Sequence, residues 1–124
     1  MVDTAQALQI ALSLPGTVDE SSPERLAFSI GGRGFAWSFM QRDHPKAKRY
    51  PNLEVLAISC SLESKALLIE AAPDRFFDDD HYSGYPAILT RLPIIDEAEL
   101  ADLLKAAHAM QAAKKPKAKK RPKA

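Results

Sequence analysis

The sequence predicts a two-layer α+β domain, with helices packed on an antiparallel sheet of about four strands in the order α-β-β-β-α-β-α. Three observations lead to this expectation. Apolar residues recur every three or four positions near both ends of the chain and once in its middle, which is typical of amphipathic helices. In the runs between, they alternate with small or polar residues, as in strands with one buried face. The length of 124 residues, 46% of them apolar, suits one such domain.

The first helix is expected over residues 3–14. Asp3 or Thr4 can accept hydrogen bonds from its N-terminal amides, and Pro15-Gly16 ends it because proline disfavours helical geometry in the preceding residue. The apolar positions at helical spacing are Ala5, Leu8, Ala11 and Leu12. The polar residues 17–24 that follow are expected to form a loop.

A β-hairpin is expected next. In residues 25–30 and 35–40 bulky apolar side chains alternate with smaller ones, and Gly31-Gly32-Arg33-Gly34 between them supplies the positive φ angles of a tight turn. A polar, basic connector then covers residues 41–52 and leads to a third strand at 53–60. This order predicts that the connector protrudes between the second and third strands.

The second half of the chain begins with a helix at residues 61–72, for which Ser61 is a suitable cap. Residues 74–86 form an irregular stretch that carries four aromatic side chains, and a fourth strand is expected at 87–92. Pro93 closes that strand.

The last helix is expected over residues 96–113, with Asp96 as its cap. Its predicted buried stripe consists of Leu100, Leu103, Leu104 and Ala107. Residues 1–113 are therefore expected to form one domain. Residues 114–124 contain only Lys, Arg, Pro and Ala, so they are expected to be a disordered basic tail.

Positive charge is concentrated in two places. The tail carries +7 without any acid, and because the whole chain carries +1, residues 1–113 carry −6. Residues 42–49 hold a local +3, which leaves the rest of the chain at −9. A polyanion would therefore have to contact these two places. The tail cations are Lys114, Lys115, Lys117, Lys119, Lys120, Arg121 and Lys123.

The basic connector is the second candidate nucleic-acid contact. Its cations are Arg42, Lys46, Lys48 and Arg49. With His44 and Tyr50 beside them, they could hold phosphates while the aromatic ring stacks on a base. Arg33, at the tip of the expected hairpin, is a similar candidate. Cations on loops and turns are also typical of an ordinary solvated surface, so both interpretations remain open here.

Several other kinds of function are disfavoured. No apolar run approaches the roughly 20 residues of a membrane span, and the N-terminus lacks the pattern of a secretory signal. The single cysteine, Cys60, excludes an internal disulfide and a multi-cysteine zinc site, and is expected to be a small buried hydrophobe in a cytoplasmic protein. No phosphate-binding glycine loop follows a strand. Catalytic residues, metals and cofactors are therefore not expected.

The stretch from Asp78 to Tyr85 allows two interpretations. Consecutive carboxylates such as Asp78-Asp79-Asp80 cannot all converge on one ion, so a turn bonded to nearby backbone is favoured over a metal site. His81, Tyr82 and Tyr85 could line a ligand cleft beside the sheet. Aromatic residues in irregular segments more often pack onto the core.

The chain resembles the MmcQ/YjbR family over residues 7–110. The segments that carry the resemblance are Leu14-Pro15-Gly16, Gly34-Phe35-Ala36-Trp37, Phe76-Phe77 and, most specifically, His81-Tyr82-Ser83-Gly84-Tyr85-Pro86. The resemblance implies a small α+β fold with protruding hairpin or loop wings, and it implies DNA binding. It carries over no catalytic residues.

Two hypotheses of function follow. In the first, the chain is a non-enzymatic protein that contacts DNA weakly and without sequence preference, through the tail and the basic connector. Such binding would weaken steeply with salt. In the second, the chain is a protein-interaction or small-ligand module whose basic tail is incidental, and the cleft near Tyr82 and Tyr85 or a sheet edge forms the site.

Overall fold

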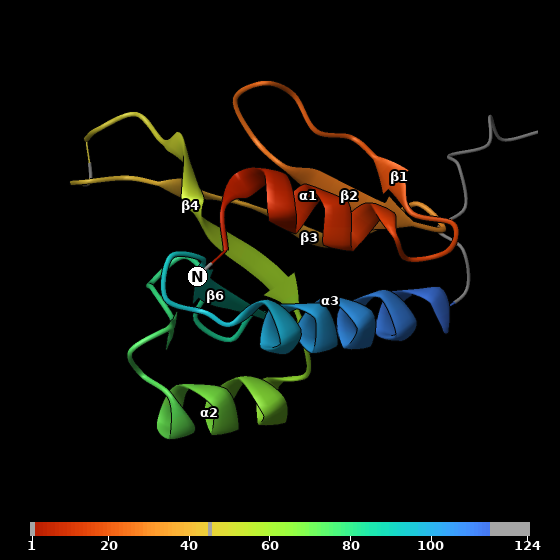
Figure 1. Ribbon diagram of the computed structural model, residues 1–124. Coiled ribbons are helices and arrows are strands. Elements are labelled where there is room, and N and C mark those ends of the chain that lie inside the picture. The colour runs from red at the N-terminus through yellow and green to blue at the C-terminus, as the bar shows by residue number, and fades with distance from the viewer. Residues whose placement is uncertain (1, 45, 115–124) are drawn as a thin grey trace, which may run out of the picture.

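Three helices and a six-stranded antiparallel sheet make up residues 2–44 and 46–114, the part of the chain that this computed structural model describes (Figure 1). The strand order across the sheet is β1-β2-β3-β4-β6-β5. The elements are α1 (Thr4–Leu12), β1 (Val18–Asp19), β2 (Ala27–Ile30), β3 (Arg33–Gln41), β4 (Tyr50–Ser59), α2 (Leu62–Ala71), β5 (Phe76–Phe77), β6 (Ala87–Arg91) and α3 (Glu97–Ala112). The α+β class is confirmed, whereas the expected strand number is wrong.

Two short strands extend the sheet beyond the expected four. β1 pairs with β2, with Val18 opposite Ser29, and β5 pairs with β6, with Phe76 opposite Thr90. Each contains two residues, which is too short for alternation to show in the sequence. Both lie at the edges of the sheet, in segments expected to be irregular.

The turn between β2 and β3 is shorter than expected. Gly31 and Gly32 have φ angles of 59° and 78°, and Ile30 pairs directly with Arg33. The hairpin therefore has the two-residue loop that needs positive φ at both positions. Arg33 and Gly34 belong to β3.

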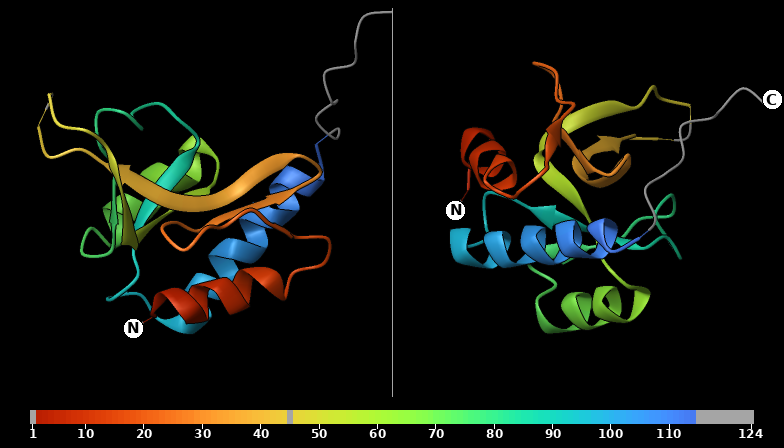
Figure 2. Two further views of the ribbon diagram at one scale, coloured as in Figure 1. Left: turned by 90° about the horizontal axis from the view of Figure 1, so that it is seen from above. Right: turned by 90° about the vertical axis from the view of Figure 1, so that its right-hand side faces the viewer.

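The flanking strands extend into both ends of the basic connector, since Gln41 belongs to β3 and residues 50–52 belong to β4. β4 begins at Tyr50, which pairs with Gln41, and Met40 pairs with Pro51. The β3–β4 hairpin therefore continues past the body of the sheet, and its end projects from the molecule (Figure 2, left). We call residues 41–44 and 46–50 the wing.

One face of the sheet carries the main core. α3 packs across β2, β3 and β4, and α1 lies beside α3. The buried side chains here include Phe28, Phe35, Leu56, Ile58, Ile88, Leu100 and Leu104. α3 buries Leu100, Leu104 and Ala107 as expected, but Leu103 only partly.

Of the helix caps expected at the starts of α1 and α3, only the first forms its side-chain hydrogen bond. Asp3 forms a capping box with Gln6, whereas the Asp96 side chain makes no cap hydrogen bond. α1 buries Ala7 and Ala11, and Leu12 at its end is 42% exposed. The helical spacing thus predicted the helix but not the whole buried face.

The opposite face of the sheet is covered by a loop instead of a helix. Its core consists of Phe39, Val55, Ala57, Tyr82, Ala87 and Leu89, with Trp37 and Phe77 packed against them. Residues 78–86 supply Tyr82 to this core, whereas α2 packs Leu68 and Ile69 against the main core. Among the described residues, no helix combines the length and apolar character needed to cross a membrane.

Candidate functional site

Two hollows lie next to each other on the loop-covered face. The aromatic hollow, of about 290 Å³, is lined by Trp37, His81, Tyr82 and Tyr85. The charged hollow, of about 440 Å³, is lined by Arg42, Asp43, His44, Arg49, Asp79, Asp80 and His81. Because His81 lines both, the structure brings together the wing and the cleft that the sequence suggests as separate candidates.

The loop that connects the hollows is held by local and distant hydrogen bonds. The Asp79 carboxylate accepts a bond of 2.8 Å from the Tyr82 amide, and Gly84 adopts a positive φ of 75°. The Lys65 ammonium donates to the carbonyls of Tyr82 and Tyr85 at 2.6 and 3.0 Å. These bonds place His81 and Tyr85 at the surface and Tyr82 beneath them.

The Asp78–His81 stretch behaves as a turn. Asp78 forms an ion pair of 3.0 Å with Lys65, and Asp79 caps the turn, so both carboxylates have structural partners. Within residues 2–44 and 46–114, no three His, Cys, Asp or Glu side chains are grouped so as to hold a metal ion.

The aromatic hollow has one buried wall and two accessible rings. Tyr82 is only 6% exposed and accepts a hydrogen bond of 2.8 Å from Trp37 Nε1. Burial raises the pKa of the Tyr82 hydroxyl, while the bond from Trp37 lowers it by less. Tyr85 is 49% exposed and stands edge-on to Trp37, with ring centroids 6.3 Å apart. Tyr82 is therefore part of the core, and Tyr85 and the half-buried Trp37 present ring surface to a ligand.

Trp37 is a site residue that the sequence analysis did not identify. It lies on β3 opposite the small residues Ala27 and Ala57. In the sequence it appears as a bulky member of an alternating strand and in one of the segments that carry the family resemblance, and neither indicates a ligand contact. The small residues opposite it would have been the available signal, but their pairing depends on a register that the sequence does not reveal.

The charged hollow is less cationic than the wing sequence indicates. Arg42 and Arg49 share it with Asp43, Asp79 and Asp80, so carboxylates outnumber guanidinium groups there. Arg49 also donates to the Met40 carbonyl at 3.2 Å. The local +3 therefore overestimates the attraction to phosphate inside the hollow.

The remaining wing side chains lie around the hollow. Lys46 and Lys48 are exposed and do not line it. The Tyr50 hydroxyl bonds to Asp43 at 3.2 Å, and desolvation together with this bond raises the Tyr50 pKa.

Arg33 lies at the other end of β3 from the wing. Gln111, in the last turn of α3, donates to the Gly34 carbonyl at 2.9 Å, so α3 ends close to the β2–β3 turn (Figure 2, left). Lys114 follows directly after α3. The other expected tail contacts, Lys115, Lys117, Lys119, Lys120, Arg121 and Lys123, lie outside the described residues. The candidate contact cations among the described residues thus occur toward both ends of β3.

Comparisons with known proteins agree with this architecture. A family model described as YjbR matches residues 12–110. The crystal structure of the Deinococcus radiodurans protein DR2400, which has a DUF419 domain, superposes with a TM-score of 0.68 at 18% identity, over 92% of this chain and 81% of that one. At this identity the likeness shows the fold alone. No curated protein matches the chain.

Proposed function

The chain belongs to the YjbR family, and from this premise we propose that it is a non-enzymatic protein that contacts DNA weakly and with little sequence preference. Single-stranded DNA is the favoured form. The wing and the two hollows orient the strand, and the basic tail supplies most of the attraction.

The observation that carries the proposal is the junction of ring surface and cations at His81. Proteins that bind single strands without sequence preference combine cations that follow the backbone with aromatic rings on which bases stack. Here Tyr85 and Trp37 offer rings in one hollow, and Arg42 and Arg49 line the adjoining one. A base on Tyr85 would place its neighbouring phosphates toward the wing.

The acids in the charged hollow account for the proposed weakness. Asp43, Asp79 and Asp80 repel phosphate at short range, so the hollow orients a strand more than it attracts one. The seven cations of residues 114–124 have no neighbouring acid in the sequence. For this reason they supply the larger, salt-sensitive share of the affinity in this proposal.

The salt dependence of binding tests the proposal. Anisotropy titrations of a labelled single strand would compare the full chain with two variants, one with its seven tail cations replaced by Gln and one carrying Lys46→Ala and Lys48→Ala. Each lost contact lowers the slope of log K against log salt by about 0.7 for a single strand. We expect a loss of several units for the tail variant and of roughly 1.4 for the wing variant.

Lys105→Ala supplies the control, because this exposed lysine on α3 belongs to neither group. It should leave the slope unchanged. If the full chain shows no binding to single-stranded or duplex DNA at low ionic strength, the proposal is wrong. Equal effects from all three variants would show nonspecific charge attraction without a defined surface.

The second candidate, a small-ligand module, is favoured by one observation. Three of the rings in the aromatic hollow meet at steep angles: Trp37 and Tyr85 at 75°, and Tyr82 and Tyr85 at 89°. Such a corner can enclose one small planar or cationic group. Competition between mononucleotides and the labelled strand separates the two candidates, since a ligand module would bind the mononucleotide as tightly as the strand.

A further inference from the structure

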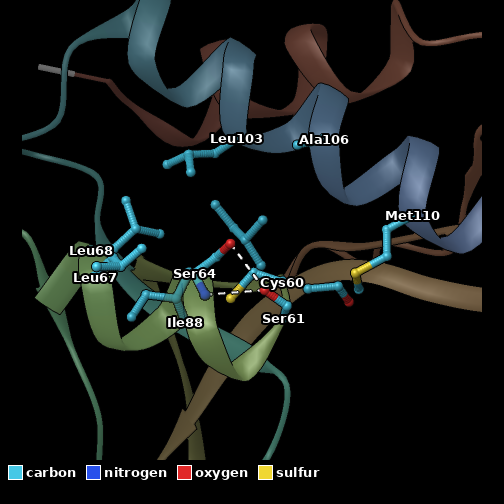
Figure 3. A pocket seen from close by; sticks show the side chains of 11 residues that line it. Cys60, Ser61, Ser64, Leu67, Leu68, Ile88, Leu103, Ala106 and Met110 are labelled. Atoms are coloured by element: carbon cyan, nitrogen blue, oxygen red, sulfur yellow. Dashed lines mark hydrogen bonds between the residues drawn. The ribbon is translucent and has the colours of Figure 1, made fainter.

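An apolar cavity lies between α2 and α3, apart from both hollows (Figure 3). Its volume is about 400 Å³. Leu67 and Leu68 of α2 form one wall, and Leu103, Ala106 and Met110 of α3 form the other. We propose that this interhelical cavity binds a small apolar molecule with an uncharged or positively charged head group. The proposal does not depend on DNA binding.

Lys65 fixes the position of α2 beside the cavity. Lys65 is 4% exposed, and its ammonium group is held by the carbonyls of Tyr82 and Tyr85 and by Asp78. Leu67 is left 60% exposed on the side that faces α3. Lys65 thus fixes α2 to the loop while Leu67 and Leu68 line the cavity.

The lining favours an apolar occupant. It contains no carboxylate, ammonium or guanidinium group, and its hydroxyls already have partners. Ser61 caps α2 and bonds to Ser64 at 3.0 Å, and Ser59 bonds to the Gly34 carbonyl. The Cys60 thiol is held neutral by burial, which raises its pKa. Few polar groups remain to retain ordered water, so apolar atoms gain by filling the space.

The size of the cavity favours a small molecule over a protein surface. Its volume falls within the range of roughly 300–1,000 Å³ that is typical of small-molecule sites. A stable dimer needs about 800 Å² from each partner, whereas α2 exposes only two large apolar side chains, Leu62 and Leu67. The helices and strand ends enclose a hollow and not a flat face.

Negative charge beside the mouth of the cavity determines which head group the ligand can carry. Glu63 lies one turn before Leu67, and Asp102 lies one turn before Ala106, so an exposed carboxylate flanks the mouth on each helix. Lys105 lies roughly 200° around α3 from Leu103 and does not line the cavity. A fatty-acid anion would be repelled by these carboxylates, whereas an alcohol or an amine would not.

Fluorescence titration of the full chain with N-phenyl-1-naphthylamine, a neutral apolar dye, tests the cavity. We expect saturable binding at one site. Ala106→Phe places a ring in the cavity from an exposed position of α3 and should weaken dye binding at least tenfold. Ala109→Phe makes the same change at an exposed position of α3 that does not line the cavity, and it should leave binding unchanged.

Two further measurements complete the experiment. Bound dye should slow alkylation of Cys60, which lines the cavity, and decanol and decylamine should displace the dye better than decanoate does. Absence of saturable binding, or equal loss in both Phe variants, would overturn the proposal. Preferential displacement by decanoate would overturn the head-group assignment. Concentration-dependent dimerisation that Ala106→Phe abolishes would identify a second copy as the occupant and overturn the small-molecule proposal.

Discussion

Lys65 anchors the loop that lines the two hollows and the helix α2 that lines the interhelical cavity. Its ammonium group is buried and has three oxygen partners, two carbonyls of the loop and the Asp78 carboxylate. A buried ammonium is tolerated only when such partners replace its water. One side chain therefore holds the His81–Pro86 segment, which carries the most specific part of the family resemblance, and sets the position of α2.

Lys65→Met tests this role. The variant keeps an unbranched apolar side chain one atom shorter but leaves the carbonyls of Tyr82 and Tyr85 without their donor, so we expect the free energy of unfolding to fall by about 2–4 kcal/mol. Urea denaturation followed by Trp37 fluorescence measures the change. Lys105→Met, at an exposed position of α3, should change stability by less than about 0.5 kcal/mol. Similar losses in the two variants would contradict the anchoring role.

Cys60 yields a second prediction at the residue scale. Burial raises its pKa, while the charge of Lys65 lowers it by less, so the thiolate fraction at pH 8 is smaller than in an unfolded chain. Together with partial burial, this should make N-ethylmaleimide react roughly tenfold more slowly with the native protein than with the protein in urea. Equal rates would show that the thiol is neither shielded nor perturbed.

Tyr85 yields the third prediction at this scale. Its ring is exposed and its carbonyl, not its side chain, holds Lys65, so Tyr85→Ala should leave the fold intact. If a base stacks on the ring, the variant should lose about 1–3 kcal/mol of affinity for single-stranded DNA, whereas Tyr85→Phe should retain it. Loss in both variants would indicate a role for the hydroxyl instead of stacking.

At the level of elements, Gly32 and Gly34 of the β2–β3 hairpin differ in backbone conformation, although the sequence predicts both as residues of one turn. Gly32 has a positive φ of 78°, whereas a Cβ at Gly34 would meet the Trp37 ring at an ordinary 3.6 Å. The left-handed conformation costs an L-residue roughly 1–2 kcal/mol. Replacing the glycine by alanine should therefore affect the free energy of unfolding differently at the two positions.

Gly32→Ala should destabilise the protein by about 1–2 kcal/mol, and Gly34→Ala should leave it unchanged or stabilise it by up to about 1 kcal/mol. The stabilisation would come from the reduced freedom of the unfolded chain. Thermal unfolding of both variants gives the comparison. A reversed order would mean that the turn is not the two-residue loop described here.

At the scale of the whole molecule, the candidate DNA-contacting cations are placed at opposite ends of β3. The strand covers nine residues, which corresponds to about 26 Å between its first and last residues. The wing begins at one end, and Arg33 and Lys114 lie toward the other, where α3 finishes beside Gly34. A strand of DNA that touches both ends must cross the molecule.

The length of the DNA should therefore matter. Affinity should rise between single strands of about 4 and 16 nucleotides and then level off, once one strand reaches both ends. In the variant without tail cations this rise should be small, because only the wing and the hollows remain. Anisotropy with a series of labelled lengths measures it, and an affinity independent of length in the full chain would refute contact at both ends.

The expectation of a disordered tail and of a single domain over residues 1–113 stays a prediction, since residues 115–124 lie outside the described part of the chain. The DNA-binding and non-enzymatic assignments also stay proposals. Within the described residues, the candidate cleft residue Tyr82 is a core residue, while His81 and Tyr85 remain surface residues of the site.

The sequence by itself determined the features that depend on neighbours along the chain. The cap of Asp3, the cap of Ser61 and the glycine turn arise from contacts within three or four residues, so residue type and spacing indicate them. The same local signature at Asp96 forms no cap hydrogen bond. Strong periodicity likewise predicted the three helices and the four longer strands. Strands of two residues carry no period and depend on the edge that they join.

Only the tertiary structure decided the candidate site and the cavity. Lys65 meets the Tyr82 carbonyl 17 positions away, and Trp37 meets the Tyr82 hydroxyl 45 positions away. Asp79 and Asp80 come to face the wing and offset its charge. Leu67 and Leu68 of α2 come to face Leu103 of α3 across the cavity. These pairings depend on register and on how the elements pack in three dimensions, which local spacing along one chain does not specify.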